Sequence, residues 1–233
     1  MHLTDRFRLA AEQLSSDKIA VRISGIYLFE RLAEDSPADH ATVYSVLAAF
    51  VRTQAPATNC PPPKEPGVGP VDIQVAMTVI GRRDTSREQS ADKPDLNRTC
   101  LAGIDLGNAN LFGTNLTDAN LAHANLTSTN LANATLNKAD LSDVDLAYAT
   151  LTGAGLTGAN LNGAFLTSAN LTRVVLDYAN LTDTRLTGTN LQSAYLLGAN
   201  LTGATLINAN LTNVRSDPRT QWPTGFTPPP LPR

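Results

Sequence analysis

Leucine recurs at every fifth position through the C-terminal half of the chain. The spacing holds without exception for 24 leucines, from Leu96 to Leu211. Two residues before each leucine stands a small or β-branched residue; of the 23 such positions from Thr99 to Ala209, 15 are alanine and five are threonine. The residue directly before the leucine is usually Asn or Asp. The pattern therefore predicts many tandem copies of one five-residue unit.

A period of five excludes both regular secondary structures. Five residues advance an α-helix by about 500°, so successive leucines would spiral around its axis. On a straight strand they would alternate between the two sides, because five is odd. The leucines share one core only if the chain turns once per unit, and an extended local backbone then points both the small residue and the leucine inward. We expect a coil of short straight pieces joined by corners; the period alone does not fix the number of units per turn.

Tandem A-(N/D)-L-X-X units, such as A-N-L-T-G at residues 199–203, resemble the pentapeptide-repeat family over roughly residues 94–215. The resemblance implies a mainly β fold, a right-handed quadrilateral β-helix with four units in each coil. It would have about six coils of about 20 residues, stacked about 4.8 Å apart into a rod about 25–30 Å long.

Sorting the outward residues at intervals of one coil gives four faces. Two faces carry nearly uniform columns of Asn before the leucine, one starting at Cys100 and the opposite one at Asn110. We expect their side chains to form ladders between coils. The other two faces are irregular. One of them brings together a candidate interaction patch, with exposed apolar groups of the kind that mark contact surfaces: Val175, Tyr178, Tyr195 and Leu197. The alternative interpretation is that the C-terminal tail folds over these residues.

The segments outside the repeats divide into four. Amphipathic helices predict a small helical module at residues 1–53. A Pro-rich linker follows at 54–70, and then a capping helix and linker at 71–93. Residues 216–233 form a C-terminal cap and Pro-rich tail. The open ends of a β-helix need to be covered. We expect Trp222 and Phe226 to form the C-terminal cap. They belong to a W-P-x-G-F string that resembles the tail of many family members.

Composition excludes several classes of function. The formal net charge is −3, so no basic surface for direct nucleic-acid binding is expected. The sequence has no stretch of about 18 or more apolar residues, so no integral membrane segment is expected. Cys60 and Cys100 are isolated and match no metal-binding spacing. We interpret them as unpaired, which favours a reducing, cytoplasmic location.

No motif indicates an enzyme, a cofactor or a metal site. His2, His40 and His123 lie in unrelated contexts, and no protease, hydrolase or phosphate-loop motif occurs. Asp140, Asp143 and Asp145 are close in sequence, but a solvated acidic edge explains them better than a cation site.

The sequence thus favours a non-catalytic protein-interaction scaffold whose partner is a protein of unknown identity or a second copy in a homodimer. The resemblance also implies an alternative, a DNA mimic that modulates type II topoisomerase (gyrase). Residues 94–215 hold eight Asp and five Lys or Arg, a net charge of −3, whereas duplex DNA of this length would carry roughly fifteen charges. A third hypothesis is an enzyme accessory or peripheral membrane protein acting through the helices.

Overall fold

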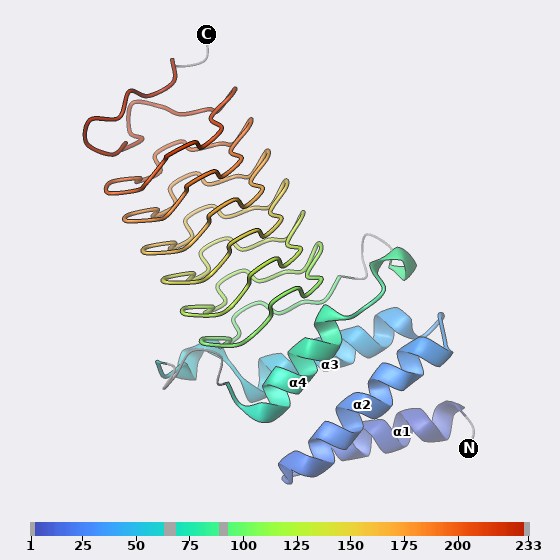
Figure 1. The fold of residues 1–233 in the computed structure, drawn as a ribbon. Coiled ribbons are helices and arrows are strands. Elements are labelled where there is room, and N and C mark those ends of the chain that lie inside the picture. The colour runs from blue at the N-terminus through green and yellow to red at the C-terminus, as the bar shows by residue number, and fades with distance from the viewer. Residues whose placement is uncertain (1–2, 63–68, 89–92, 231–233) are drawn as a thin grey trace.

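The computed structural model describes residues 3–62, 69–88 and 93–230. A bundle of helices lies at one end and a rod of stacked coils extends away from it to the C-terminus (Figure 1). The bundle contains α1 (Leu3–Leu14), α2 (Ile19–Asp35), α3 (His40–Gln54) and α4 (Val71–Gly81). Two single-turn 3₁₀ helices, Ala57–Asn59 and Thr85–Arg87, lie between the bundle and the rod.

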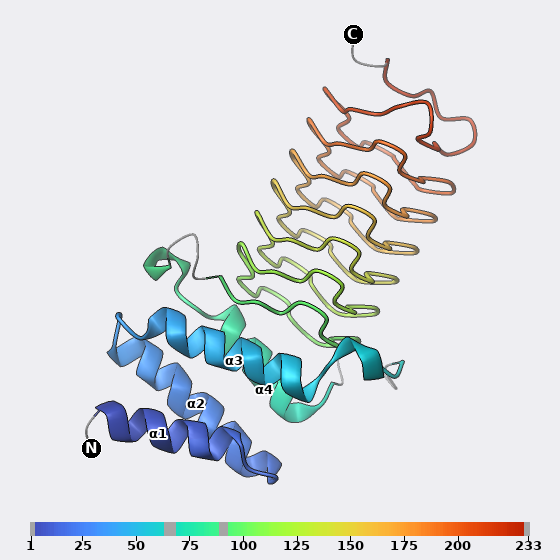
Figure 2. The ribbon, with the colours of Figure 1, turned by 180° about the vertical axis from the view of Figure 1, so that it is seen from behind.

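The helical module and the rod share one continuous apolar core. α1 packs closely on α2 at Gly25, where an added Cβ would lie 2.8 Å from the Leu14 nitrogen. Phe7 of α1 meets Phe29 of α2 edge to face, with ring centroids 5.1 Å apart. α3 and α4 lie nearer to the first coil than α1 and α2 do (Figure 2). The buried residues Ile73, Ala76, Met77, Val79 and Ile80 of α4 belong to the same continuous core as the leucines of the rod.

Parallel bridges join residues 20 apart along the rod, from Asp95–Asn115 to Tyr195–Arg215. Each coil therefore contains four five-residue units and presents four faces. The repeated leucines are at most 2% exposed from Leu96 to Leu201, so they fill the interior as the period predicts. The residues two positions earlier are also buried from Thr99 to Ala204, except Ala109, which is half-buried.

Each unit turns at the second residue after its leucine. From Arg98 to Asn213 this residue has a positive φ, between 52° and 74°. Only eight of these corner positions are glycine, and even Tyr148 and Tyr178 adopt the left-handed conformation. A non-glycine residue there costs about 1–2 kcal/mol, and the hydrogen bonds between stacked coils offset that cost.

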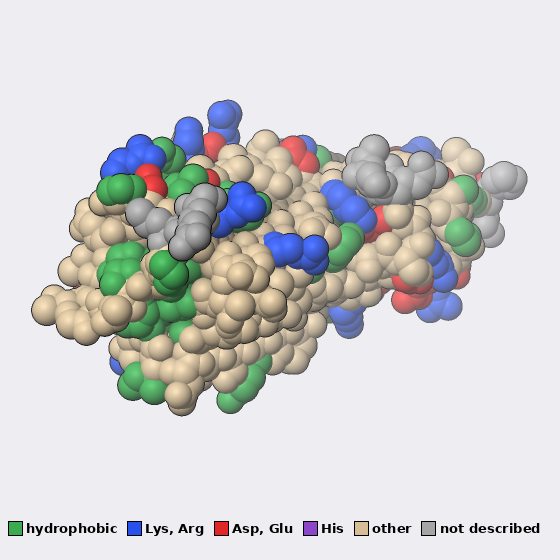
Figure 3. Space-filling model, turned by 90° about the horizontal axis from the view of Figure 1, so that it is seen from above, with side chains coloured by type: hydrophobic (Ala, Val, Ile, Leu, Met, Phe, Trp, Pro, Cys, Tyr) green, Lys and Arg blue, Asp and Glu red, His purple; other side chains and the backbone are tan. Residues whose placement is uncertain are grey.

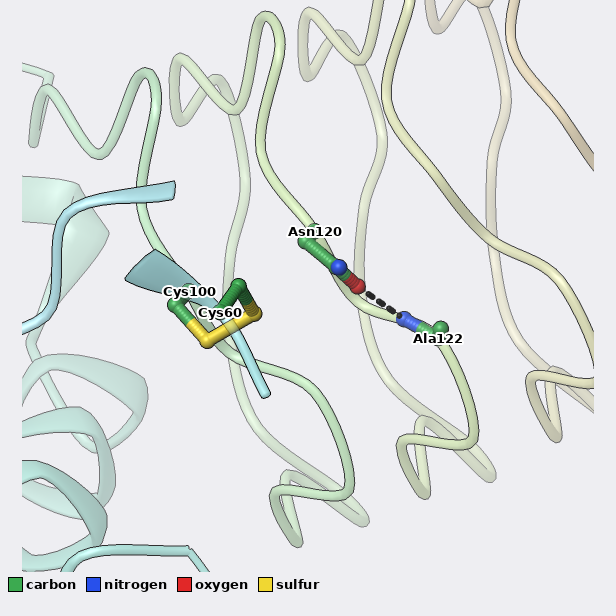
Figure 4. The surroundings of a disulfide bond; sticks show 4 residues. All are labelled: Cys60, Cys100, Asn120 and Ala122. Carbon is green, nitrogen blue, oxygen red and sulfur yellow. Dashed lines mark hydrogen bonds between the residues drawn. A yellow bond between two sulfur atoms is a disulfide. The ribbon is translucent and has the colours of Figure 1, made fainter. Parts of the chain in front are cut away.

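The Asn and Asp columns have two roles. As expected, amides donate to the side chain one coil earlier, for example from Asn180 Nδ2 to Asn160 Oδ1 at 2.9 Å. The same oxygens also accept from the main-chain N–H two residues later, as in Asn120 Oδ1 with Ala122 N at 2.9 Å (Figure 4). This turn-forming role was not anticipated from the sequence. It explains why Asp replaces Asn freely, because both supply the accepting oxygen.

The first coil has no preceding coil, and the helical module supplies partners for its main chain. On one face Cys100 N donates to Ala55 O at 2.7 Å. On the next, the carboxamide of Gln74 acts as a substitute strand: it accepts from Asp105 N at 3.0 Å and donates to Asp105 O at 2.7 Å. On the third, Asn110 N donates to Gly81 O at 2.7 Å.

Arginine side chains complete the junction. On the fourth face Arg52 donates to the carbonyl of Asp95. Arg83 is 2% exposed and donates to the carbonyls of Asn110 and Phe112, the latter at 2.6 Å. Its charge is balanced by Glu88, at 2.7 Å, which is also bound by Lys93 at 2.9 Å. The start of the rod is therefore bound to the helical module on all four faces, so its edges are not open to other chains.

A disulfide joins Cys60 to Cys100, with Cα atoms 5.2 Å apart (Figure 4). The interpretation of these cysteines as unpaired is therefore wrong. Cys100 begins the column that continues with Asn120, so its side chain points outward from the rod. The segment after α3 crosses that face, where Pro56 bridges Thr99, and so carries Cys60 to it. The two cysteines are close because of how the helical module packs on the rod, and their spacing in the sequence does not predict it.

Candidate interaction surface

The four residues of the candidate patch lie together near the C-terminal end of the rod. Val175 and Tyr195 stack on one face through a parallel bridge. Tyr178 and Leu197 follow at the adjoining corner, where Tyr178 N donates to Leu197 O at 2.8 Å. Tyr178 is 57% exposed, whereas the other three side chains are half-buried. The patch is thus one continuous surface with a single prominent aromatic ring.

Arginines lie over both tyrosine rings of the patch. The Arg215 guanidinium lies 5.1 Å from the centroid of Tyr195, and that of Arg219 lies 5.1 Å from the centroid of Tyr178. Such contacts are favourable because the ring face is electron-rich. The patch therefore carries two guanidinium groups beside its aromatic rings, of which that of Arg219 is paired with the carboxylate of Asp217. Arg215 stands one coil after Tyr195, so the column pattern contained it; Arg219 lies beyond the repeats and could not be placed from the pattern.

Asp217 holds Arg219 in place. Its carboxylate accepts from Arg219 Nε at 2.7 Å and from Gly198 N at 2.9 Å. Desolvation alone would raise the pKa of Asp217, but these hydrogen bonds outweigh it and lower the pKa to about 2. The carboxylate therefore stays charged at neutral pH, and the guanidinium remains fixed over Tyr178.

A groove of about 660 Å³ adjoins the patch. Arg173 and Arg215 lie along it, Tyr195 lines it, and Pro229 and Pro230 of the tail form another part of its wall. The tail thus reaches the patch but leaves Tyr178 exposed. The opposite irregular face repeats the chemistry on a smaller scale, with Arg185 4.5 Å from the ring centroid of Phe165.

The C-terminal end of the rod is only partly covered. Trp222 packs against the core and stacks on Phe226, with ring centroids 5.3 Å apart. The bridge from Asn200 leads to Gln221, 21 residues on, because the repeat has ended and the chain gains one residue. Within residues 93–230, the faces of Thr205 and Asn210 have no bridge to a later residue. Viewed from this end, hydrophobic side chains gather at the surface (Figure 3).

Residues 3–62, 69–88 and 93–230 contain no group of three or more His, Cys, Asp or Glu side chains that could hold a metal ion. Over the same ranges, the helices are too short or too polar to cross a bilayer.

The family model for pentapeptide repeats matches eight copies in overlapping segments, at residues 95–127, 124–163, 149–192 and 179–215. Together these span just over half of the chain. The chain belongs to the pentapeptide-repeat family. Membership implies the right-handed β-helix, and the bridges 20 residues apart agree with it. A comparison with curated proteins finds no significant match.

Several solved proteins are similar to about half of this chain. Rfr23 from the cyanobacterium Cyanothece 51142 is 36% identical over 49% of this chain and 64% of its own length, with a TM-score of 0.32. HetL from Nostoc sp. strain PCC 7120, a protein involved in heterocyst differentiation regulation, is 31% identical over 52% of this chain and 69% of its own, with a TM-score of 0.20. QnrB1, a plasmid-mediated fluoroquinolone resistance protein, is 20% identical over 49% of this chain and 78% of its own, with a TM-score of 0.22.

Proposed function

We propose that this chain is a non-catalytic scaffold that binds another protein through the patch of Val175, Tyr178, Tyr195 and Leu197. The observation that carries the proposal is the pair of arginines over the tyrosines, beside a groove that Arg173 also lines. Tyr and Arg are the residue types most enriched at the energetic centres of interfaces. The partner surface that fits is one with acidic side chains flanked by apolar groups.

Exposure of Tyr178 supports this role over a purely structural one. The residue occupies a corner with a φ of 58°, where glycine or asparagine would be accommodated at lower cost. Its ring covers Gly198, where an added Cβ would lie 2.8 Å from a ring carbon. The following coil is thus shaped to let the ring lie flat, which leaves one ring face to Arg219 and an open edge for a partner.

Site-directed photo-crosslinking tests the proposal. A photo-reactive amino acid at Leu197 should capture a defined partner in cells that express the full chain, and Tyr178→Ser/Tyr195→Ser should abolish the adduct. The same group at Ile207, an exposed apolar residue half a coil after Leu197 and therefore on the opposite corner of the rod, is the matched control. Size-exclusion chromatography with light scattering separates a second copy of the chain from a different protein. Equal adducts from both positions, or an adduct that survives the double substitution, would contradict the proposal.

Charge argues against the alternative of topoisomerase modulation by DNA mimicry. The repeat region has a net charge of only −3, far below the roughly fifteen charges of duplex DNA of this length. A gyrase supercoiling assay, with and without a fluoroquinolone, is the direct test. Inhibition or drug protection at stoichiometric protein would establish the alternative in place of the scaffold.

The expected cytoplasmic location rested on unpaired cysteines. The disulfide between Cys60 and Cys100 removes that argument, because disulfides persist mainly in oxidising compartments. Alkylation of the protein in intact cells, followed by mass spectrometry, would show whether Cys60 and Cys100 are reduced or disulfide-bonded in the compartment that contains the protein.

A further inference from the structure

A second cavity lies in the helical module, away from the patch on the rod. It has a volume of about 390 Å³ and opens between α2, the start of α3 and the segment that follows α4. Neither the scaffold nor the capping of the first coil uses it. Its lining is polar and charged, and includes Glu30, Glu34, His40, Tyr44, Arg82, Asp84 and Arg87.

His40 is the unusual member of this lining. It is the first residue of α3 and only 2% exposed, yet neither of its ring nitrogens has a hydrogen-bond partner. Its ring packs on that of Tyr44, with centroids 4.8 Å apart. Burial lowers the pKa of His40, so the ring is neutral near pH 7. A neutral imidazole offers one donor and one acceptor, and here both are unused inside the cavity.

The carboxylates of the cavity outnumber the guanidiniums. Arg82 pairs with Glu30 at 3.2 Å, and Arg87 pairs with Asp84 at 3.0 Å. Across the described ranges, Glu34 has no ion pair. Burial raises the pKa of Glu30, Arg82 opposes this, and the nearby charge of Glu34 raises it further. A positive charge between Glu30 and Glu34 would relieve their mutual repulsion.

We propose that this cavity binds a small primary amine with a hydroxyl or carbonyl oxygen beside the amine. The ammonium group sits between Glu30 and Glu34, where it neutralises the excess negative charge. The neighbouring oxygen accepts a hydrogen bond from the protonated ring nitrogen of His40. A free anion does not fit, because both guanidiniums are already paired. A metal ion does not fit either, since the described residues bring no set of three metal-ligating groups together here.

Nitrogen-15 NMR of the histidine side chains in the full-length protein tests the proposal. Ethanolamine is the probe; ethylamine lacks its oxygen, ethylene glycol lacks its amine, and inorganic phosphate represents an anion. Ethanolamine should shift the His40 nitrogens saturably at about 1–10 mM, as its few heavy atoms allow, and leave His2 and His123 unchanged. Ethylamine should bind more weakly, and ethylene glycol and phosphate should produce no shift.

Two variants locate the amine. Glu34→Gln removes the unpaired charge at an exposed position and should weaken ethanolamine binding about tenfold without loss of helicity. Glu12→Gln changes another exposed glutamate, on α1, that pairs with Arg8; it is the control and should bind normally. Three outcomes would each overturn the proposal. The first is that the His40 nitrogens do not shift when the ethanolamine concentration is 100 times the expected dissociation constant. The others are a comparable shift with phosphate or ethylene glycol, and unaltered ethanolamine binding in Glu34→Gln.

Discussion

Arg83 offers the sharpest test of how the rod is joined to its helical module. Its guanidinium is fully buried against the equally buried carboxylate of Glu88, 2.7 Å away. It also donates to Phe112 O at 2.6 Å and to Thr114 Oγ1 at 3.2 Å. Arg83→Met keeps an apolar side chain of similar length but leaves the carboxylate and the carbonyls of the first coil without this donor.

Removing one partner of a buried ion pair costs about 3–5 kcal/mol. Lys93 remains 2.9 Å from Glu88 and offsets part of this loss, while each carbonyl left unsatisfied adds about 1–3 kcal/mol. Because these groups form one network, their costs do not add, and we expect about 4 kcal/mol in total. At about 2–4 °C per kcal/mol for a chain of this size, the melting temperature should fall by roughly 10 °C.

Guanidinium chloride unfolding, followed by helical circular dichroism and by Trp222 fluorescence, measures the loss at the two ends of the molecule. Hydrogen exchange should rise first at residues 108–114, which face Arg83. Arg98→Met is the matched control, because the Arg98 side chain is 78% exposed and its ion pair is long; it should cost under about 1 kcal/mol. In a double-mutant cycle, Glu88→Gln should cost less in the Arg83→Met background than alone. A loss below about 1 kcal/mol for Arg83→Met would refute the buried network.

Three further changes probe the same end of the molecule. Reduction of the disulfide Cys60–Cys100, or the substitution Cys60→Ser, should destabilise the protein by about 2–4 kcal/mol because the bond closes a long loop. Thermal unfolding with and without reductant measures this loss. The melting temperature of Cys60→Ser should not change when reductant is added. Gln74→Glu keeps an acceptor for Asp105 N but loses the donor to Asp105 O. This loss should cost about 1 kcal/mol of stability and speed hydrogen exchange of the Asp105 amide. The side chain in Gln74→Asn would be too short to make either bond. Burial lowers the folded-state pKa of His40 below the ordinary value of 6.5, so the unfolded chain takes up the proton at a higher pH than the folded protein. The free energy of unfolding should therefore fall as the pH drops below about 6.5. His40→Phe should flatten that part of the profile of stability against pH.

The repeat made the rod predictable at the level of single residues. A five-residue period with an invariant leucine allows only one inward-facing set, so the buried leucines and the amide columns follow from counting. The helical character of the N-terminal segment was also evident from its amphipathic pattern. The second function of Asn120 and its equivalents, as turn-forming acceptors, was missed because it is a local interaction that the stacking argument did not address.

The junction was not predictable for a different reason. Gln74, Arg83 and Cys60 lie outside the repeat, and each acts on main-chain groups or a side chain of the first coil. Such pairings depend on how a helix sits against the rod, for which the sequence has no period. The same limit applies to Arg219, whose position over Tyr178 depends on the irregular chain after the last repeat. The patch itself could be assembled from the columns, whereas the cavity around His40 could not.

The disulfide has a consequence for how the chain breaks. Cys60 and Cys100 are 40 residues apart, and the bond turns the intervening chain into a covalent ring that includes α4. A protease that cuts this ring once opens it without dividing the molecule. The helical module and the rod would migrate as one species until a reductant is added. The connection between the two parts is thus protected against a single cleavage, and only two events together, a cut and a reduction, remove the covalent link.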